Sequence, residues 1–405
     1  MTENDARAND IAAELEALFQ RLERTPDFDA PELLAHDAAD ALLMRTAAPQ
    51  LLSDAGEPPA PGSLAIIGDR HGALTLGAAA VLGARGIRTH QDPLLGERAL
   101  ARNADRLGLS ETYSSHPLDA SLLSGARTVI MQLPRGLEAL DEIAWAIAQR
   151  AHPDVRVFAG GRVKHMMLAQ NEVLRRYFGE VKAGLGWRKA RVLETAVPRP
   201  VAEPPFPKWG VDRELPFKLA AFGATFGGPK LDHGSRLLLS TLRSQPPARE
   251  PKRVLDLGCG NGVLAVSAAL TWPDAEIVAS DQSEAAVRAT ALTAEAAGVS
   301  ERLVIHRADG TEAVPDASID LVLLNPPFHT GATVHAGVAH RLIRDCARVL
   351  RPGGELRIVY NSHLAHRPLV EAAIGPVRQL ARDKTFTVLA ATTPLANLSG
   401  APRLE

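Results

Sequence analysis

The stretch VLDLGCGNG, residues 254–262, decides the fold class of this chain. Its first four residues predict a buried strand, and Gly258, Gly260 and Gly262 follow it. Glycine has no Cβ, so this loop can turn tightly and let a ligand approach its backbone. The apolar run at 264–270 predicts a helix whose first amides point at that ligand. The pattern D-x-G-x-G-x-G lacks the spacing G-x-G-x-x-G that a nicotinamide-dependent oxidoreductase needs.

Strands and helices alternate on the carboxyl side of this loop. Apolar and β-branched runs predict strands at 275–280, 303–306, 319–324 and 355–360. Helical spacing of apolar residues predicts helices at 283–297 and 338–350. This alternation is typical of an open, mostly parallel α/β sheet.

The first half of the chain repeats the second half in outline. Four landmarks recur in the same order, with offsets that stay between 189 and 198 residues. They pair 64–74 with 254–264, Asp92 with Asp281, 132–135 with 325–328, and 164–165 with 362–363. The repeated order indicates an internal duplication of one α/β unit.

Proline clusters divide the chain. Five prolines lie between residues 198 and 207, and Pro216 follows. Because proline removes a backbone donor and fixes φ, this density predicts an extended linker at 198–216. An earlier breaker run, EPPAPG at 57–62, follows two amphipathic stretches, so we expect a helical N-terminal segment at 1–55.

Composition excludes several classes of protein. The chain has 405 residues, 46% of them apolar and 23% charged, which is the balance of a globular protein and not of a disordered one. No apolar run is long enough to span a membrane, and MTENDARAND at the N-terminus lacks the apolar core of a signal peptide. With only Cys259 and Cys346, a disulfide scaffold is excluded and a cytoplasmic monomer is expected.

The formal net charge of −2 means that any nucleic acid must be bound through a local patch. The segment 341–384 has nine basic and four acidic residues, which indicates either a phosphate-contacting surface or a solvated helix face. Histidines recur in the second half, but their spacing matches no ligand signature, so no metal is expected. They are His306, His329, His335, His340, His363 and His366.

Acidic residues follow two of the predicted strands. Asp281 ends the second strand, where a carboxylate can accept both hydroxyls of a ribose, or can cap the helix that begins near 283. Asp309 and Gly310 follow the third strand, where they either contact an adenine edge or form a turn.

The motif NPPF at 325–328 carries the functional argument. It follows the apolar strand at 319–324, at the edge of the sheet where α/β proteins bind ligands. Pro326 and Pro327 stiffen the turn and remove two donors, which leaves the Asn325 oxygen and backbone carbonyls as acceptors for a planar amino group. Phe328 offers a face on which a base can stack. The structural alternative is a rigid turn with a core phenylalanine.

Together these motifs resemble class I S-adenosylmethionine-dependent methyltransferases of the amino-group type. His329 and the segments FGGPKLDHGSRLLLS (226–240) and GELRIVYNSHL (354–364) narrow the resemblance to ribosomal RNA guanine-N2 methyltransferases, namely the small-subunit methyltransferase C and large-subunit methyltransferase G types. The resemblance covers about residues 60–395. It implies two tandem Rossmann-like methyltransferase domains with mostly parallel seven-stranded sheets, of which only the second is catalytic.

The resemblance also implies roles by position. The residues implied to bind S-adenosyl-L-methionine are Asp256, Gly258, Gly260, Asn261, Asp281, Gln282, Asp309, Gly310 and Asn325. The residues implied to hold the target base for catalysis are Asn325, Pro326, Pro327 and Phe328, with Asp232 as a further helper. The implied partner is ribosomal RNA or a ribosomal subunit.

The first half departs from the pattern. Ile66 and Arg70 stand where the second half has Asp256 and Gly260, and QLPR at 132–135 replaces the NPPF turn. We therefore expect a degenerate domain without cofactor at 56–197, which holds RNA or the other domain, and a catalytic domain at 217–405.

Two other interpretations of the second half stay open at this point. Methyltransferases that modify the amino group of DNA adenine or protein glutamine share a related turn, usually with tyrosine at its last position. A non-catalytic RNA-binding assembly factor is the other, although such a factor is expected to have lost the second glycine loop, which is intact here.

Overall fold

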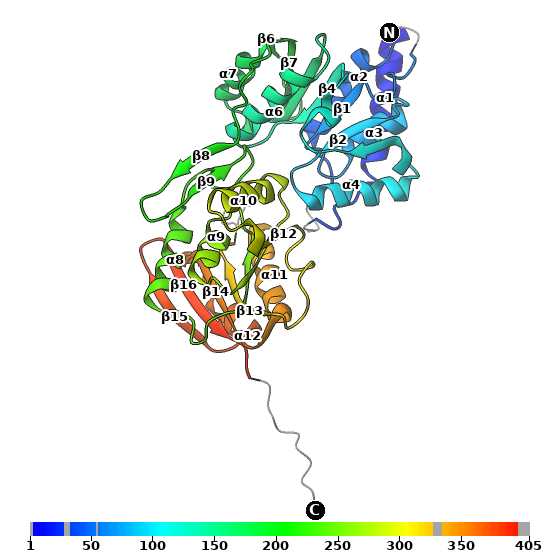
Figure 1. Cartoon of the computed structure of the whole chain (residues 1–405). Helices are drawn as coiled ribbons and strands as arrows, with labels where there is room; N and C mark the ends of the chain where they lie inside the picture. The colour runs from blue at the N-terminus through cyan, green and yellow to red at the C-terminus, as the bar shows by residue number, and fades with distance from the viewer. Residues whose placement is uncertain (1–2, 28–32, 54–55, 327–333, 396–405) are drawn as a thin grey trace, which may run out of the picture. The chain divides into compact units, whose positions relative to one another are not determined.

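The computed structural model describes residues 3–27, 33–53, 56–326 and 334–395. The chain divides into two compact units, Met1–Phe206 and Pro207–Glu405. Each unit contains one seven-stranded sheet together with helices (Figure 1). The prediction of two α/β domains is therefore confirmed.

The first sheet has the strand order β3-β2-β1-β4-β5-β7-β6. Strands β1 to β5 are parallel, and β7 runs antiparallel to both β5 and β6. Its strands are β1 (Leu64–Ile67), β2 (Ile87–His90), β3 (Tyr113–Ser115), β4 (Thr128–Gln132), β5 (Arg156–Arg162), β6 (Phe178–Ala183) and β7 (Ala190–Pro198).

Helices cover both faces of this sheet. One core joins residues of the first four helices to one face, and a second core joins residues of the next three to the other face. These helices are α1 (Glu3–Phe19), α2 (Ala38–Leu51), α3 (Ala73–Val81), α4 (Leu94–Leu107), α5 (Ala120–Leu123), α6 (Leu137–Arg150) and α7 (Leu168–Tyr177). Helices α1 and α2 supply Leu15, Phe19 and Leu43 to the first core, so the expected N-terminal helical segment packs as part of the first unit.

The second sheet repeats the first with the order β12-β11-β10-β13-β14-β16-β15. Its strands β10 to β14 are parallel, and β16 runs antiparallel to both β14 and β15. The strands are β10 (Arg253–Leu257), β11 (Glu276–Asp281), β12 (Leu303–Arg307), β13 (Ile319–Leu324), β14 (Leu350–Asn361), β15 (Val377–Arg382) and β16 (Phe386–Thr392). The identical order in both units agrees with the duplication inferred from the sequence.

The second unit is also covered on both faces. Residues of α8, α9 and α10 share one core with one face of the sheet, and residues of α11 and α12 share another core with the opposite face. These helices are α8 (His233–Ser244), α9 (Val263–Thr271), α10 (Glu284–Ala296), α11 (Val334–Val349) and α12 (Arg367–Ala373).

Part of the expected linker at 198–216 is ordered as a strand. Strand β8 (Lys208–Val211) pairs antiparallel with β9 (Lys218–Ala221). The prolines of this segment are concentrated at its start, and the residues of β8 include none, so their backbone donors remain free to pair. The Ala220 amide in β9 donates to Thr293 Oγ1 at 3.0 Å, which fixes the hairpin to α10.

The sheet order places the candidate site residues together. Strand β10 lies between β11 and β13. Strands β11 and β12 are added on one side of β10, and β13 and β14 on the other, so the strand order reverses between β10 and β13. In open α/β sheets, ligands bind outside the carboxyl ends of the strands at such a reversal. The glycine loop after β10 and Asn325 after β13 both stand at this boundary.

Candidate active site

The glycine loop forms an open cradle at the end of β10. Gly258 and Gly260 have φ of 79° and 56°, a region that residues with a side chain rarely adopt. A Cβ placed on either glycine would have no atom within 4 Å, so both face open space. The amides of Gly258 and Cys259 donate to the Ser280 carbonyl at 2.8 and 3.1 Å, which fastens the loop to β11.

Asp256 presents a buried carboxylate beneath this loop. It is 1% exposed, and its Oδ2 accepts from the Ala265 amide of α9 at 2.8 Å. Its Oδ1 is buried with no hydrogen-bond partner in the part of the chain that the structure describes. Burial, with a smaller contribution from the charge of Asp281, raises the pKa of Asp256 to about 7. A cationic ligand next to Oδ1 would stabilise the ionised form.

Asp281, at the end of β11, accepts two backbone hydrogen bonds from neighbouring segments. Its Oδ2 accepts from the Gly260 amide at 3.1 Å, and its Oδ1 accepts from the Ser283 amide at 3.0 Å. It therefore holds the glycine loop and also the start of α10. The neighbouring Gln282 has a buried Oε1 without a partner among the described residues.

Asn261 braces the loop. Its Nδ2 donates to the carbonyls of Gly228 and Lys230 at 2.9 and 3.0 Å, and its Oδ1 accepts from the Val263 amide at 3.3 Å. Both amide protons are thus used within the protein. The geometry gives Asn261 a positioning role, in which it holds the segment before α8 against the glycine loop.

Arg341 forms a bidentate ion pair with the carboxylate of Asp309. Its Nη1 and Nη2 donate to Asp309 Oδ2 and Oδ1, each at 2.6 Å. The Gly310 carbonyl next to it accepts from Ser280 Oγ at 2.8 Å. From the sequence alone, Arg341 was only one of the nine basic residues at 341–384. The spacing between Asp309 and Arg341 gives no signal of the bidentate ion pair that they form.

Asn325 is held from one side only. Its Nδ2 donates to Asp232 Oδ1 at 3.2 Å and to Ser235 Oγ at 3.0 Å. A carboxylate can only accept, so Asp232 forces the amide nitrogen, and not the oxygen, to face α8. The Oδ1 of Asn325 takes no part in these two bonds, and it is buried without a partner among the described residues.

Helix α8 supplies the groups that orient Asn325. Asp232 is its N-cap, and Asp232 Oδ1 accepts from the Ser235 amide at 3.1 Å as well as from Asn325. A Cβ on Gly234 would stand 3.2 Å from both Asn325 Oδ1 and Asp232 Oδ1, so glycine leaves the room that this contact needs. Ser235 and Gly234 were missed from the sequence, because they resemble ordinary residues of a helix start.

The predicted turn is described only in part. Pro326, which follows Asn325, is buried. Pro327 and Phe328 lie outside the described residues, as does His329.

The equivalent loop in the first unit is built differently. Asp69, which is 1% exposed, accepts from the amides of Leu74 and Thr75 of α3 at 3.2 and 2.7 Å. Thr75 aligns with Ala265, whose amide is held by Asp256 in the second unit. In the first unit, the carboxylate that binds the amides of α3 therefore belongs to the loop after β1. In the second unit, the carboxylate that binds the amide of α9 belongs to strand β10. Arg70, which aligns with Gly260, lacks the positive φ of that glycine.

Four of the nine basic residues at 341–384 form internal ion pairs. Arg341 pairs with Asp309, Arg348 with Asp316, and Arg351 with Asp320. Arg357 is fully buried, where it pairs with Glu355 and donates to the carbonyls of Thr241 and Gln245 at the end of α8. These four cations fasten the fold together.

Within the described ranges, no three His, Cys, Asp or Glu side chains gather closely enough to hold a metal ion. The same ranges contain no helix with both the length and the apolar character that a membrane crossing requires.

Two family models match the chain. The model described as RLMG N-terminal domain matches residues 12–199, and the model described as Methyltransferase small domain matches residues 217–390.

Curated relatives match over nearly their whole length. Ribosomal RNA large subunit methyltransferase G of Streptomyces coelicolor is 31% identical over 91% of this chain and 97% of its own. The protein of the same name from Pseudomonas entomophila is 33% identical over 91% and 96%. A solved T. thermophilus 16S rRNA N2 methyltransferase, in complex with AdoMet and guanosine, shares the fold with a TM-score of 0.70, at 23% identity over 88% and 92% of the two chains.

These matches agree with the two seven-stranded sheets of the fold. The chain belongs to the ribosomal RNA large subunit methyltransferase G family.

Proposed function

We propose that this protein transfers a methyl group from S-adenosylmethionine to the exocyclic N2 amine of a guanosine in large-subunit ribosomal RNA. One observation carries the proposal: Asn325 is oriented by Asp232 and Ser235, which use its amide nitrogen, while its oxygen is buried and unpartnered among the described residues. A buried acceptor without a donor is costly, so a donor is expected to fill it. The relatives from Streptomyces coelicolor and Pseudomonas entomophila are named as large-subunit ribosomal RNA methyltransferases.

The residues at the sheet edge fit the cofactor. Asp256, Gln282 and Asn325 follow or end three adjacent strands, and each has a buried oxygen without a partner among the described residues. We infer that Asp256 forms an ion pair with the ammonium group of S-adenosylmethionine and that Gln282 accepts a hydrogen bond from its adenosine part. Gly258 and Gly260 leave the open space that a bulky ligand needs against the backbone. When bound, S-adenosylmethionine supplies an activated methyl group on a sulfonium.

Asn325 acts on the nucleophile. Its Oδ1 accepts a hydrogen bond from the guanine amine, which holds the nitrogen in place and stabilises the positive charge that develops there as the N–C bond forms and the S–C bond breaks. The methylated nitrogen then loses one proton to water. Because the methyl donor is already activated, correct placement of the two reactants supplies most of the acceleration. No strong base is required before transfer. A paired base cannot enter the site, so the guanosine must be single-stranded or flipped out of its helix.

We infer that the first unit binds no cofactor. Asp69 already occupies the amides at the start of α3, and Arg70 stands where the second unit has Gly260. Isothermal titration of the full chain with S-adenosylmethionine should therefore give one site per chain. Two sites per chain would contradict this inference.

Methyl transfer to alternative acceptors tests the proposal. The full-length protein is incubated with tritiated S-adenosylmethionine and, separately, undermethylated large ribosomal subunits, their protein-free RNA, duplex DNA and ribosomal proteins. Label is expected in large-subunit RNA. Label in DNA or protein alone would instead favour the other amino methyltransferases, and label in no acceptor would favour a non-catalytic assembly factor.

A further inference from the structure

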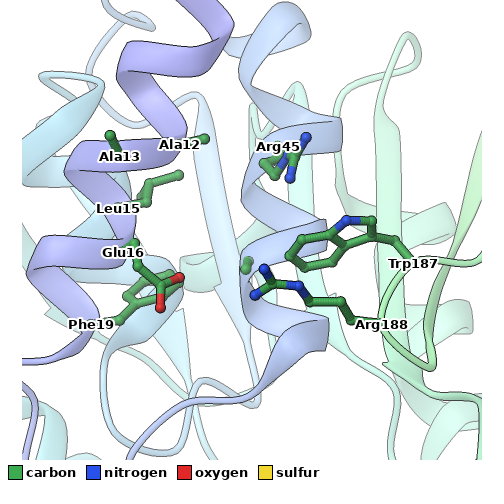
Figure 2. Close-up of a pocket in the computed structure, with 9 residues that line it drawn as sticks. Ala12, Ala13, Leu15, Glu16, Phe19, Arg45, Trp187 and Arg188 are labelled. Carbon is green, nitrogen blue, oxygen red and sulfur yellow. The ribbon is translucent and has the colours of Figure 1, made fainter.

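A half-open cavity of about 370 Å³ lies in the first unit, outside the candidate active site. We call it the Trp187 pocket. Figure 2 shows its walls: α1 on one side, Arg45 from α2, and Trp187 and Arg188 from the turn between β6 and β7. Apolar side chains of α1, including Leu15 and Phe19, form part of the lining. Its volume is within the range of pockets that bind small ligands.

Two guanidinium groups stack on Trp187. The Cζ atoms of Arg45 and Arg188 lie 4.9 and 4.6 Å from the centre of its ring. Figure 2 draws Arg45 above the ring and Arg188 below it. A cation held against an aromatic face loses less freedom when its N–H edge binds an anion, so the ring pre-organises both groups.

The turn that carries Arg188 has an uncommon backbone. Trp187 and Ala190 exchange two backbone hydrogen bonds, of 2.9 and 2.8 Å, around a two-residue turn. Arg188 and Lys189 at its centre have φ of 47° and 63°. Turns with two positive φ values favour Asn-Gly, because side chains with a Cβ are strained there. A segment that keeps two cations under such strain is a candidate ligand site.

The basic residues of the Trp187 pocket outnumber its acidic residues. Arg45, Arg188 and Lys189 form no ion pair with any residue in the described parts of the chain. Glu16 is the single acidic residue of the lining, and in Figure 2 its carboxylate faces Arg188 from the opposite wall. The Lys189 carbonyl accepts from the Val163 amide at 2.9 Å, so the turn lies beside the basic residues that end β5.

We propose that the Trp187 pocket binds one nucleotide of a single-stranded RNA segment. Arg45 and Arg188 bind its phosphates, the apolar wall of α1 takes the base, and Glu16 accepts a base N–H. A polyanion is favoured over a free metabolite because the turn adjoins two further cations: the Lys189 carbonyl binds Val163, which lies between Arg162 at the end of β5 and Lys164. This inference rests on the proposed function, since it names a second contact for the same RNA substrate.

Salt-dependent RNA binding tests the proposal. A fluorescein-labelled short single-stranded RNA is titrated with the full-length wild type and with the double variant Arg45→Gln/Arg188→Gln, between about 50 and 200 mM salt. The variant should bind at least about tenfold more weakly. Its slope of log K against log salt should fall by about 1.4, since each phosphate contact on a single strand contributes about 0.7.

The matched control removes two other exposed cations of the first unit, as Arg156→Gln/Arg175→Gln. The control should keep wild-type affinity and slope. Equal losses of RNA affinity in both double variants would overturn the proposal that the Trp187 pocket binds RNA, because such losses would reflect the change in net charge alone. If guanosine monophosphate binds as tightly as the RNA, the proposal that the pocket binds an RNA strand would be overturned.

A third variant separates binding from stability. Lys189→Gly relieves the left-handed strain, so it should raise the melting temperature while it weakens RNA binding. Unchanged RNA binding would count against the role of this turn. Methylation by Arg45→Gln/Arg188→Gln should show a raised KM for RNA with kcat retained. If the wild type methylates no RNA, the proposed function fails, while the binding comparison still decides the pocket.

Discussion

The side-chain nitrogen of Asn325 donates to the hydroxyl oxygen of Ser235 across 3.0 Å, from the end of β13 to the first turn of α8. This bond and the parallel one to Asp232 use both protons of the amide. The oxygen of Asn325 is left as the free acceptor of this amide, and it is buried without a partner among the described residues. The orientation of the acceptor is thus set before any substrate binds.

Ser235→Ala should lower kcat by about tenfold with little change in the affinity for S-adenosylmethionine. It removes one of two acceptors for the Asn325 amide, and an unsatisfied buried donor costs about 1–3 kcal/mol. Steady-state kinetics measure the first quantity and isothermal titration the second. Ser240→Ala on the same helix is the matched control, since its hydroxyl only donates to the Leu237 carbonyl. Equal kcat values for both variants would contradict the orienting role.

Gly234→Ala should separate activity from stability. The added methyl would stand 3.2 Å from Asn325 Oδ1, closer than ordinary contact, so it should displace the acceptor and reduce kcat. Alanine is also the better helix former, by about 1 kcal/mol, so the melting temperature should not fall. Thermal melting and methylation assays on the same preparation decide this. Full activity in the variant would show that the acceptor needs no such space.

The affinity for S-adenosylmethionine should rise with pH through neutrality. Burial raises the pKa of Asp256 to about 7, so the free protein holds this carboxyl protonated at lower pH and ionised at higher pH. Only the ionised form attracts the ammonium, so the affinity should fall by up to about tenfold per pH unit below 7. Titration calorimetry at several pH values measures this. Asp256→Asn should bind more weakly with a flatter profile, and an unchanged profile would assign the pH dependence elsewhere.

Arg341→Met should weaken S-adenosylmethionine binding by about three- to tenfold. The variant removes the two bonds that fix Asp309, and a partly exposed bidentate pair contributes on the order of 1 kcal/mol. Arg344→Met is the control, because Arg344 lies one turn further along α11 and is exposed. Calorimetry on both variants gives the comparison. Equal affinities would mean that the pair with Asp309 is structural only.

The five strands β10 to β14 of the second unit were predicted from local sequence patterns, whereas the antiparallel strands β15 and β16 were not. The glycine loop and the apolar strand before Asn325 have local signals, because a buried parallel strand is continuously apolar and a tight loop needs glycine. The aligned landmarks of the two halves predicted an internal duplication, and the shared strand order of the two sheets agrees with it. The start of β14 at Leu350 was not anticipated, since RPGG at 351–354 predicts a break between helix and strand.

The orientation of the site could not be predicted in the same way. Ser235 and Arg341 act through contacts that span 90 and 32 residues of sequence. Such contacts depend on tertiary packing and leave no periodic or motif signal. Asn261 shows the converse, because its motif suggested a cofactor contact while its amide protons are used to brace the loop.

The identity of the methylated nucleoside tests the central claim most directly. Large-subunit RNA from an undermethylated source is treated with labelled S-adenosylmethionine and either wild-type protein or Asn325→Ala, then digested to nucleosides and separated by mass spectrometry. The account predicts labelled N2-methylguanosine with the wild type. With Asn325→Ala it predicts a loss of at least about a hundredfold and undiminished cofactor binding. A methyl group on another atom or another base, or full turnover by Asn325→Ala, would contradict the account.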